Sequence, residues 1–137
     1  MDYLFKWTDD MSVNQTIIDF QHRQLFNQIN ILLSAIVNRL EPKVVDEAIT
    51  FLGQYIDGHL KYEEEYMKEN NYPELALHQA EHQDFIKNYK KFRGQKNDQV
   101  SIEILAQEIE QYLGNWLINH IGQTDKKYAE YIEKMVA

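Results

Sequence analysis

Apolar residues recur every three or four positions along nearly the whole chain, and this period predicts an all-α protein. The pattern divides into four long amphipathic helices, expected at about residues 16–40, 42–69 and 73–93, and from Asp98 or Ser101 onward. The breaks between these helices contain residues that commonly end or begin a helix, namely Pro42, Asn70, Asn71, Pro73 and Gly94. Because the connections are short, we expect an up-down-up-down antiparallel four-helix bundle.

The two ends of the chain differ from these four helices. About the first fifteen residues are expected to form an extended arm, which Phe5 and Trp7 would pin against the bundle by burying their rings. A short C-terminal helix is expected to run through Met135. We see no internal repeat, so residues 1–137 are interpreted as one domain.

The composition narrows the classes of function. A net charge of −8 with scattered basic residues argues against nucleic acid as a partner. Cysteine is absent, which leaves histidine and carboxylate as the metal-binding side chains. No apolar run approaches the roughly 18 residues that a membrane span needs, and the first ten residues do not have the pattern of a signal peptide. We therefore expect no membrane insertion, a cytoplasmic location and, because no apolar stripe is left over, a monomer.

All five histidines fall on the predicted inner faces of the helices, where a polar side chain needs a physical reason. A spacing of four residues turns a helix by only about 40° beyond a full turn, so each of the pairs His59–Glu63 and His78–His82 shares one face. Such a pair alone is more often a surface pair or a hydrogen-bonded core histidine. Here both pairs meet the two other histidines, His22 and His120, at the same end of the expected bundle. A shared metal ion would satisfy donors that cannot all satisfy one another.

Three acidic residues near these histidines are out of phase with the inner faces. Asp125 follows His120 by five residues, which is about 140° out of phase in a regular α-helix. Gly122 lies between them and is expected to allow a kink or break. Asp125 would then either join the histidines or cap the short final helix, and the spacing alone slightly favours the cap. Glu64 and Glu65 rotate away from the inner stripe and are expected to form a solvated acidic face.

Four segments carry a resemblance to a known family: IIDFQHRQLF around His22, HLKYE from His59, HQAEH from His78 and HIGQTD from His120. In this order they resemble the haemerythrins, and specifically the single-domain bacteriohaemerythrins, over nearly the whole chain. The resemblance implies a protein that holds two iron ions and binds molecular oxygen reversibly, for transport, storage or delivery, and that is not an enzyme. It also implies seven metal ligands: His22, His59, Glu63, His78, His82, His120 and Asp125.

The resemblance divides these ligands between the two irons, with His78, His82 and His120 on one iron and His22 and His59 on the other. Glu63 and Asp125 would bridge the irons together with an oxo or hydroxo group. One coordination position then remains open on the iron held by two histidines, where oxygen would bind.

The same resemblance implies an apolar oxygen pocket beside the open position. Its expected lining residues are Trp116, Leu117 and Ile121, with Trp7 from the arm closing the edge. Tyr72 and Tyr128 are candidate hydrogen-bond donors next to the ligands.

Two other functions remain open. The domain would serve equally as a sensor of oxygen, nitric oxide or redox state that acts on a separate signalling partner. A di-iron oxidase or iron-handling protein of the ferritin-like type is the second alternative, although those sites use four glutamates and two Glu-x-x-His motifs. An oxidase that receives the oxygen would be a further partner of unknown identity.

Overall fold

The computed structural model describes residues 5–95 and 102–136, and every regular element in these residues is a helix. The first three long helices are α1 (Thr16–Val37), α2 (Pro42–Glu69) and α3 (Leu75–Gln95). The fourth is a continuous rod of five segments, namely α4 (Ile102–Glu108), the π-helix η2 (Ile109–Asn115), α5 (Trp116–Asn119), the π-helix η3 (His120–Asp125) and α6 (Lys126–Val136). The prediction of an all-α protein is confirmed, while the expected starts of the fourth helix at Asp98 or Ser101 lie outside the described residues.

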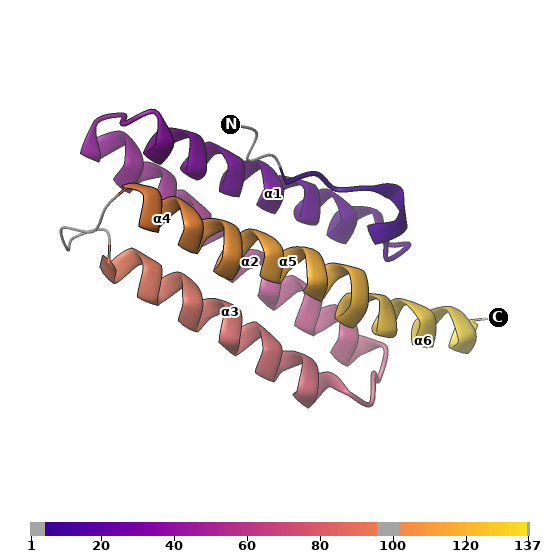
Figure 1. Cartoon of the computed structure of the whole chain (residues 1–137). Helices are drawn as coiled ribbons and strands as arrows, with labels where there is room; N and C mark the ends of the chain where they lie inside the picture. The colour runs from indigo at the N-terminus through magenta and orange to yellow at the C-terminus, as the bar shows by residue number, and fades with distance from the viewer. Residues whose placement is uncertain (1–4, 96–101, 137) are drawn as a thin grey trace.

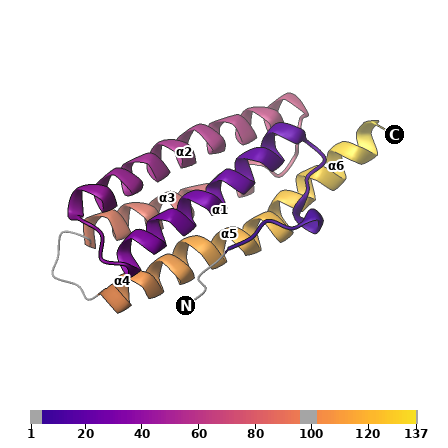
Figure 2. The ribbon, with the colours of Figure 1, turned by 90° about the horizontal axis from the view of Figure 1, so that it is seen from above.

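The four helical rods lie side by side (Figure 1), and apolar side chains from all four form a shared core. Helix α1 contacts α2 and the fourth rod, and α3 contacts α2 and the fourth rod, so each rod has two neighbours. The view from above shows α5 and α6 continuing the line of α4 without a break in direction (Figure 2). This arrangement surrounds the core with one face of every rod.

Two helices end in the same hydrogen-bonded motif. Asn71 has a positive φ of 55°, and the amides of Asn71 and Tyr72 donate to the carbonyls of Lys68 and Met67. This Schellman geometry satisfies carbonyls that the last helical turn leaves free, so the predicted end of α2 is confirmed. Arg39, with φ 54°, ends α1 in the same way.

Three predicted helix boundaries shift by a few residues. The expected end of α3 near residue 93 is wrong, because the helix continues through Gly94 to Gln95. Helix α1 ends at Val37 rather than near residue 40, because the left-handed conformation of Arg39 stops the helix. Helix α3 begins at Leu75 rather than Pro73, because Pro73 and Glu74 lie in a turn that the Leu75 amide closes by donating to the Tyr72 carbonyl.

A layer of buried polar side chains divides the apolar core. The larger apolar cluster fills most of the bundle and includes Leu25, Leu60 and Ile121. The smaller cluster lies nearer the start of α1 and includes Ile18, Met67, Tyr72 and Tyr128. All five histidines, Glu63 and Asp125 are buried, and along α1 His22 falls between Ile18 and Leu25. The polar side chains are therefore shielded by apolar packing on both sides.

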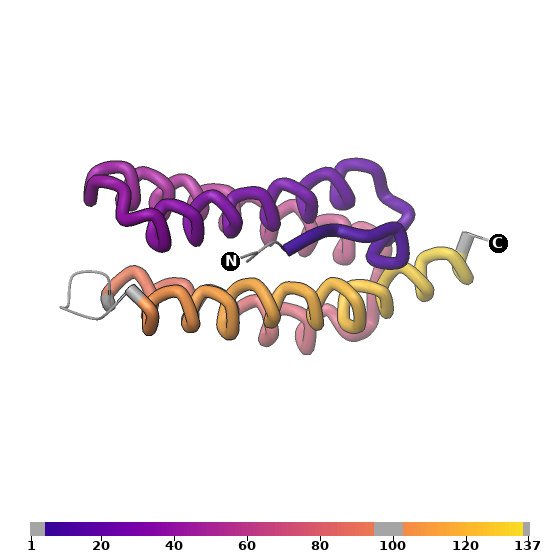
Figure 3. The backbone as a smooth tube through the Cα atoms, turned by 45° about the horizontal axis from the view of Figure 1, so that its top comes forward, coloured from indigo at the N-terminus to yellow at the C-terminus, as the bar shows by residue number. Residues whose placement is uncertain are grey.

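Residues 5–15 run along the bundle before α1 begins (Figure 3). The amide of Phe5 donates to Asn30 Oδ1, and Asn30 Nδ2 donates back to the Phe5 carbonyl, both at 2.9 Å. The buried Phe5 ring lies against Gly114 of η2, where an added Cβ would come within 2.0 Å of it. Trp7 is half-buried, with the Arg23 guanidinium 4.8 Å from its ring centre.

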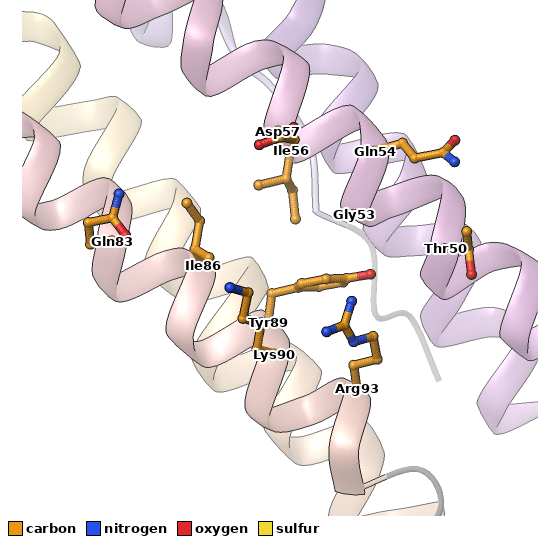
Figure 4. Close-up of a pocket in the computed structure, with 10 residues that line it drawn as sticks. All are labelled: Thr50, Gly53, Gln54, Ile56, Asp57, Gln83, Ile86, Tyr89, Lys90 and Arg93. Carbon is orange, nitrogen blue, oxygen red and sulfur yellow. The ribbon is translucent and has the colours of Figure 1, made fainter.

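A groove of about 460 Å³ lies between α2 and α3 (Figure 4). Ile56 and Ile86 lie in it between polar side chains, and the hydroxyl of Tyr89 donates to the Ile49 carbonyl at 2.6 Å. None of the predicted metal ligands or oxygen-pocket residues lines this groove. No helix within residues 5–95 or 102–136 combines the length and the apolar character that crossing a bilayer requires.

Candidate metal centre

The structure brings all seven predicted ligand side chains together inside the bundle. One comes from α1, two from α2, two from α3 and two from η3, so every rod contributes. Each is at most 4% exposed. Within the described residues, the donor atoms form two groups, each within 4.8 Å: Glu63, His78, His82, His120 and Asp125 in the first, and His22, His59 and Glu63 in the second. We call these the three-histidine group and the two-histidine group.

Asp125 faces both groups with different oxygens. Its Oδ1 lies 2.8 Å from His78 Nε2 and 2.9 Å from His120 Nε2, both in the three-histidine group. Its Oδ2 lies 3.1 Å from His22 Nε2 in the two-histidine group. The carboxylate therefore spans the space between the two groups.

Glu63 has the same arrangement. Its Oε1 lies 3.2 Å from His78 Nε2 and 2.9 Å from His82 Nε2. Its Oε2 lies 3.2 Å from His22 Nε2 and 3.6 Å from His59 Nε2. Both buried carboxylates thus present one oxygen to each histidine group.

The path of the fourth rod corrects two expectations about Asp125. Residues His120–Asp125 form the π-helix η3, in which hydrogen bonds join residues five apart and residue i+5 returns to the face of residue i. The rod then continues directly into α6, so no break occurs at Gly122, which has no positive φ. Neither oxygen of Asp125 accepts a hydrogen bond, so the cap interpretation is wrong. The wider helical turn alone brings Asp125 to the histidines.

The donor atoms fit a metal pair better than they fit one another. His120 Nε2 and both Asp125 oxygens are buried without a hydrogen-bond partner in the described structure, although they lie within 3.1 Å of other donor atoms. Buried charges without directed partners are costly. Imidazole and carboxylate together suit iron, which accepts both ligand types. The chemistry and the orientation of these atoms are therefore those of a metal site.

Comparison with known proteins agrees with this site. A family model described as "Hemerythrin HHE cation binding domain" matches residues 14–132. The chain belongs to the haemerythrin family. The resemblance inferred from the sequence is thereby confirmed, and the matched region contains all seven side chains of the candidate centre.

Individual haemerythrins match over most of their length. A bacteriohemerythrin of Stenotrophomonas maltophilia is 32% identical over 130 residues, covering 95% of this chain and 82% of the relative. A bacteriohemerythrin of Clostridium acetobutylicum is 28% identical, covering 93% of this chain and 100% of the relative. A myohemerythrin of Theromyzon tessulatum is 29% identical, covering 90% of each.

In this haemerythrin, neighbouring charges shift most pKa values of the site in the direction opposite to the effect of burial. Burial, and for Asp125 the nearby Glu63 charge, would raise the carboxyl pKa values, but the surrounding imidazoles hold the pKa of both carboxyls well below the usual range. Burial alone would lower the pKa of His22 and His78, but the two neighbouring carboxylates raise these pKa values to about 9 and about 10. Burial dominates at His59, whose pKa falls to about 3.

Three histidines also make contacts through Nδ1, the ring nitrogen that does not face Glu63 or Asp125. Their partners are residues that the helical pattern did not predict. His82 Nδ1 lies 2.8 Å from Glu64 Oε2, so the expectation that Glu64 is simply solvated is wrong. Glu64 points toward the neighbouring α3 rather than into water, which a pattern within one helix cannot show. Glu65 is exposed, as expected.

Glu81 and Gln21 are the other two residues that contact Nδ1 of a candidate ligand. His120 Nδ1 lies 3.0 Å from Glu81 Oε1, and His59 Nδ1 lies 2.7 Å from Gln21 Oε1. Each directly precedes a predicted ligand in sequence, and this position, about 100° around the helix, faces the next rod. Adjacency to a ligand is the signal that could have identified them.

The two candidate tyrosine donors have different roles. The buried Tyr128 hydroxyl donates to Glu63 Oε2 at 3.0 Å, so it holds one candidate ligand in place. Tyr72 instead donates to Glu74 at 3.3 Å and meets the Tyr128 ring edge-on, with ring centres 6.3 Å apart. The expectation that Tyr72 donates directly beside the ligands is therefore wrong.

One predicted oxygen-pocket residue contacts a candidate ligand directly. The Trp116 ring stacks on the His120 ring, with centres 4.6 Å apart and planes 14° apart. Leu117 and Ile121 are buried in the larger apolar cluster, and the half-buried Trp7 packs against that cluster. The structure thus places Trp116 against a candidate ligand of the three-histidine group, and the other three residues in or against the larger apolar cluster.

Proposed function

We propose that this chain binds molecular oxygen reversibly at a non-haem di-iron centre. The observation that carries the proposal is the placement of Glu63 and Asp125, each with one oxygen at each histidine group. Such carboxylates are suited to bridging two metal ions, whereas a single-metal site would need only one group. Membership of the haemerythrin family supports the same conclusion.

In this proposal His78, His82 and His120 hold one iron, and His22 and His59 hold the other. Glu63, Asp125 and an oxo or hydroxo group bridge the pair. When bound, the irons supply the electrons that make oxygen binding favourable. The two-histidine group provides fewer protein donors, so the open position for oxygen belongs to that side.

The remaining residues keep the chemistry reversible. Trp116, Leu117 and Ile121, with Trp7 at the edge, form an apolar lining that excludes water from the pocket. The Tyr128 hydroxyl donates to Glu63 Oε2 and so fixes the carboxylate that serves both groups. Protein side chains thus orient the ligands and limit access of protons.

A binding role fits the donor set better than catalysis does. Ferritin-like di-iron sites use four glutamates and two Glu-x-x-His motifs, whereas five imidazoles and two carboxylates form this centre. A shell this rich in histidine leaves little room for a substrate beside oxygen. We also infer that the rods form an up-down-up-down antiparallel bundle, with residues 5–15 as an arm along it.

Metal analysis and oxygen spectroscopy on the whole chain test the proposal. We expect about two iron ions per chain, one for each histidine group, and an absorption in oxygen that disappears under vacuum and returns with oxygen. His78→Ala should lose the iron and the absorption. The control Leu77→Ala removes an exposed side chain from the adjacent position of α3 and should retain both. Irreversible oxidation of the parent in one exposure to oxygen would refute reversible binding.

A further inference from the structure

Two histidines of the three-histidine group, His82 and His120, contact anionic side chains through their outer ring nitrogens. Glu64 accepts from His82, and Glu81 accepts from His120, through the ring nitrogens that face away from the candidate metal ions. Both carboxylates are themselves held in place: Gln79 Nε2 donates to Glu64 at 3.0 Å, and Thr124 Oγ1 donates to Glu81 at 2.8 Å. These contacts give the three-histidine group two fixed negative charges outside its ligands.

Among the described residues, no such charge contacts the Nδ1 atoms of the two-histidine group. His59 Nδ1 meets Gln21, whose side-chain amide is neutral. His22 Nδ1 is buried and has no hydrogen-bond partner within the described residues, as is also true of His78 Nδ1 in the three-histidine group. The two halves of the centre therefore differ in the charge of their outer partners as well as in the number of histidines.

The charge of the outer partner changes the donor strength of an imidazole. A ring that donates its N–H to a carboxylate becomes more basic, and a more basic ligand stabilises ferric iron more than ferrous iron. A neutral amide oxygen can hold the ring in the same orientation, but it cannot supply the negative charge. The outer partners are thus a means of setting the reduction potential without touching the metal.

We propose that Glu64 and Glu81 are positioning residues that favour the ferric state at the three-histidine group, while Gln21 leaves the oxygen-binding side less electron-rich. This inference rests on the proposed di-iron function and deepens it. The side chain of Glu64 is 27% exposed and that of Glu81 is 44% exposed. Because solvent screens the more exposed charge, Glu64 has the larger effect.

A set of charge-changing substitutions in the iron-loaded protein tests this inference. Glu64→Gln and Glu81→Gln retain an oxygen acceptor but remove the charge, whereas Gln21→Glu adds a charge behind the other group. The control Glu65→Gln makes the same charge change at an exposed position of α2. The oxidised and reduced fractions are measured at a series of applied potentials with redox mediators, and the iron content of each variant is measured in parallel.

Removing a charge beside the three-histidine group and adding one beside the two-histidine group should shift the ratio of oxidised to reduced iron in opposite directions. Glu64→Gln should lower the ratio of oxidised to reduced iron at a fixed potential by about tenfold, comparable with the lower end of the effect that losing such an outer partner has on metal affinity. Glu81→Gln should lower it less. Gln21→Glu should raise the ratio, and Glu65→Gln should leave it unchanged. Loss of packing alone would not raise this ratio in Gln21→Glu while lowering it in Glu64→Gln and Glu81→Gln.

Failure of this inference and failure of the proposed function would give different results. If both glutamine variants keep the parent ratio, or if Gln21→Glu moves it in the same direction as they do, the inference is overturned while iron and oxygen binding by the parent still stand. If the parent takes up no iron, the proposed function itself fails. Should a glutamine variant not fold, the comparison of Gln21→Glu with Glu65→Gln still decides the direction.

Discussion

At the residue scale, the metal-free centre holds protons that a metal ion must displace. Burial alone would keep the imidazoles neutral, but the neighbouring carboxylates of Asp125 and Glu63 raise the pKa of His22 to about 9 and that of His78 to about 10. Both rings are therefore cationic at neutral pH without metal. A metal ligand must be a neutral imidazole, so metal binding and proton release are coupled.

We expect ferrous iron, added without oxygen at about pH 7.5, to release at least about two protons per chain, those held by His22 and His78. Because protons compete with the metal, the apparent affinity should rise with pH until these pKa values are passed. Calorimetric titration in buffers with different ionisation enthalpies measures the protons released. The release should shrink near pH 10, and an equal heat in all buffers at pH 7.5 would contradict the expectation.

At the element scale, the fourth rod contains two glycines in different surroundings. Gly122 in η3 is exposed, has no positive φ, and an added Cβ there would meet nothing within 4 Å in the described part of the chain. Gly114 in η2 is buried, and an added Cβ would lie 2.0 Å from the Phe5 ring. The first glycine is thus replaceable, while the second makes room for residues 5–15.

These surroundings predict opposite effects of the same substitution. Gly122→Ala should stabilise the protein by about 0.5–1 kcal/mol, because alanine loses less backbone entropy in a helix, with no loss of iron. Gly114→Ala should destabilise it by about 1–3 kcal/mol through overpacking against Phe5. Urea unfolding of both variants gives the comparison. Destabilisation and iron loss in Gly122→Ala would revive the interpretation of Gly122 as a required kink.

The helical period was enough to predict the helices and the faces of the histidines, because a stripe repeated over several turns tolerates small errors in register. It could not predict how Asp125 reaches the centre, since a period of 3.6 residues does not apply within a π-helix. It also misplaced Glu64, whose partner His82 lies on another helix. Contacts between helices and local changes of helical pitch depend on the packed structure, which the chain pattern does not contain.

At the scale of the whole molecule, the candidate centre joins all four rods. Its seven side chains form a polar layer between two apolar clusters, and burial opposes the charge on each titrated group. Without metal, this layer holds cationic imidazoles, anionic carboxylates and donor atoms without hydrogen-bond partners. We therefore expect metal binding to add stability across this layer.

Iron should for this reason stabilise the whole bundle rather than one segment. A ligand that binds only the folded state at a free concentration of 100 times its dissociation constant adds about 2.7 kcal/mol, so chelation should lower the melting temperature markedly. Thermal unfolding of iron-loaded and metal-free protein measures this difference. In His78→Ala the melting temperature should not respond to iron, whereas Leu77→Ala should respond like the parent. Equal melting temperatures for the parent with and without iron would show that the metal does not link the four rods.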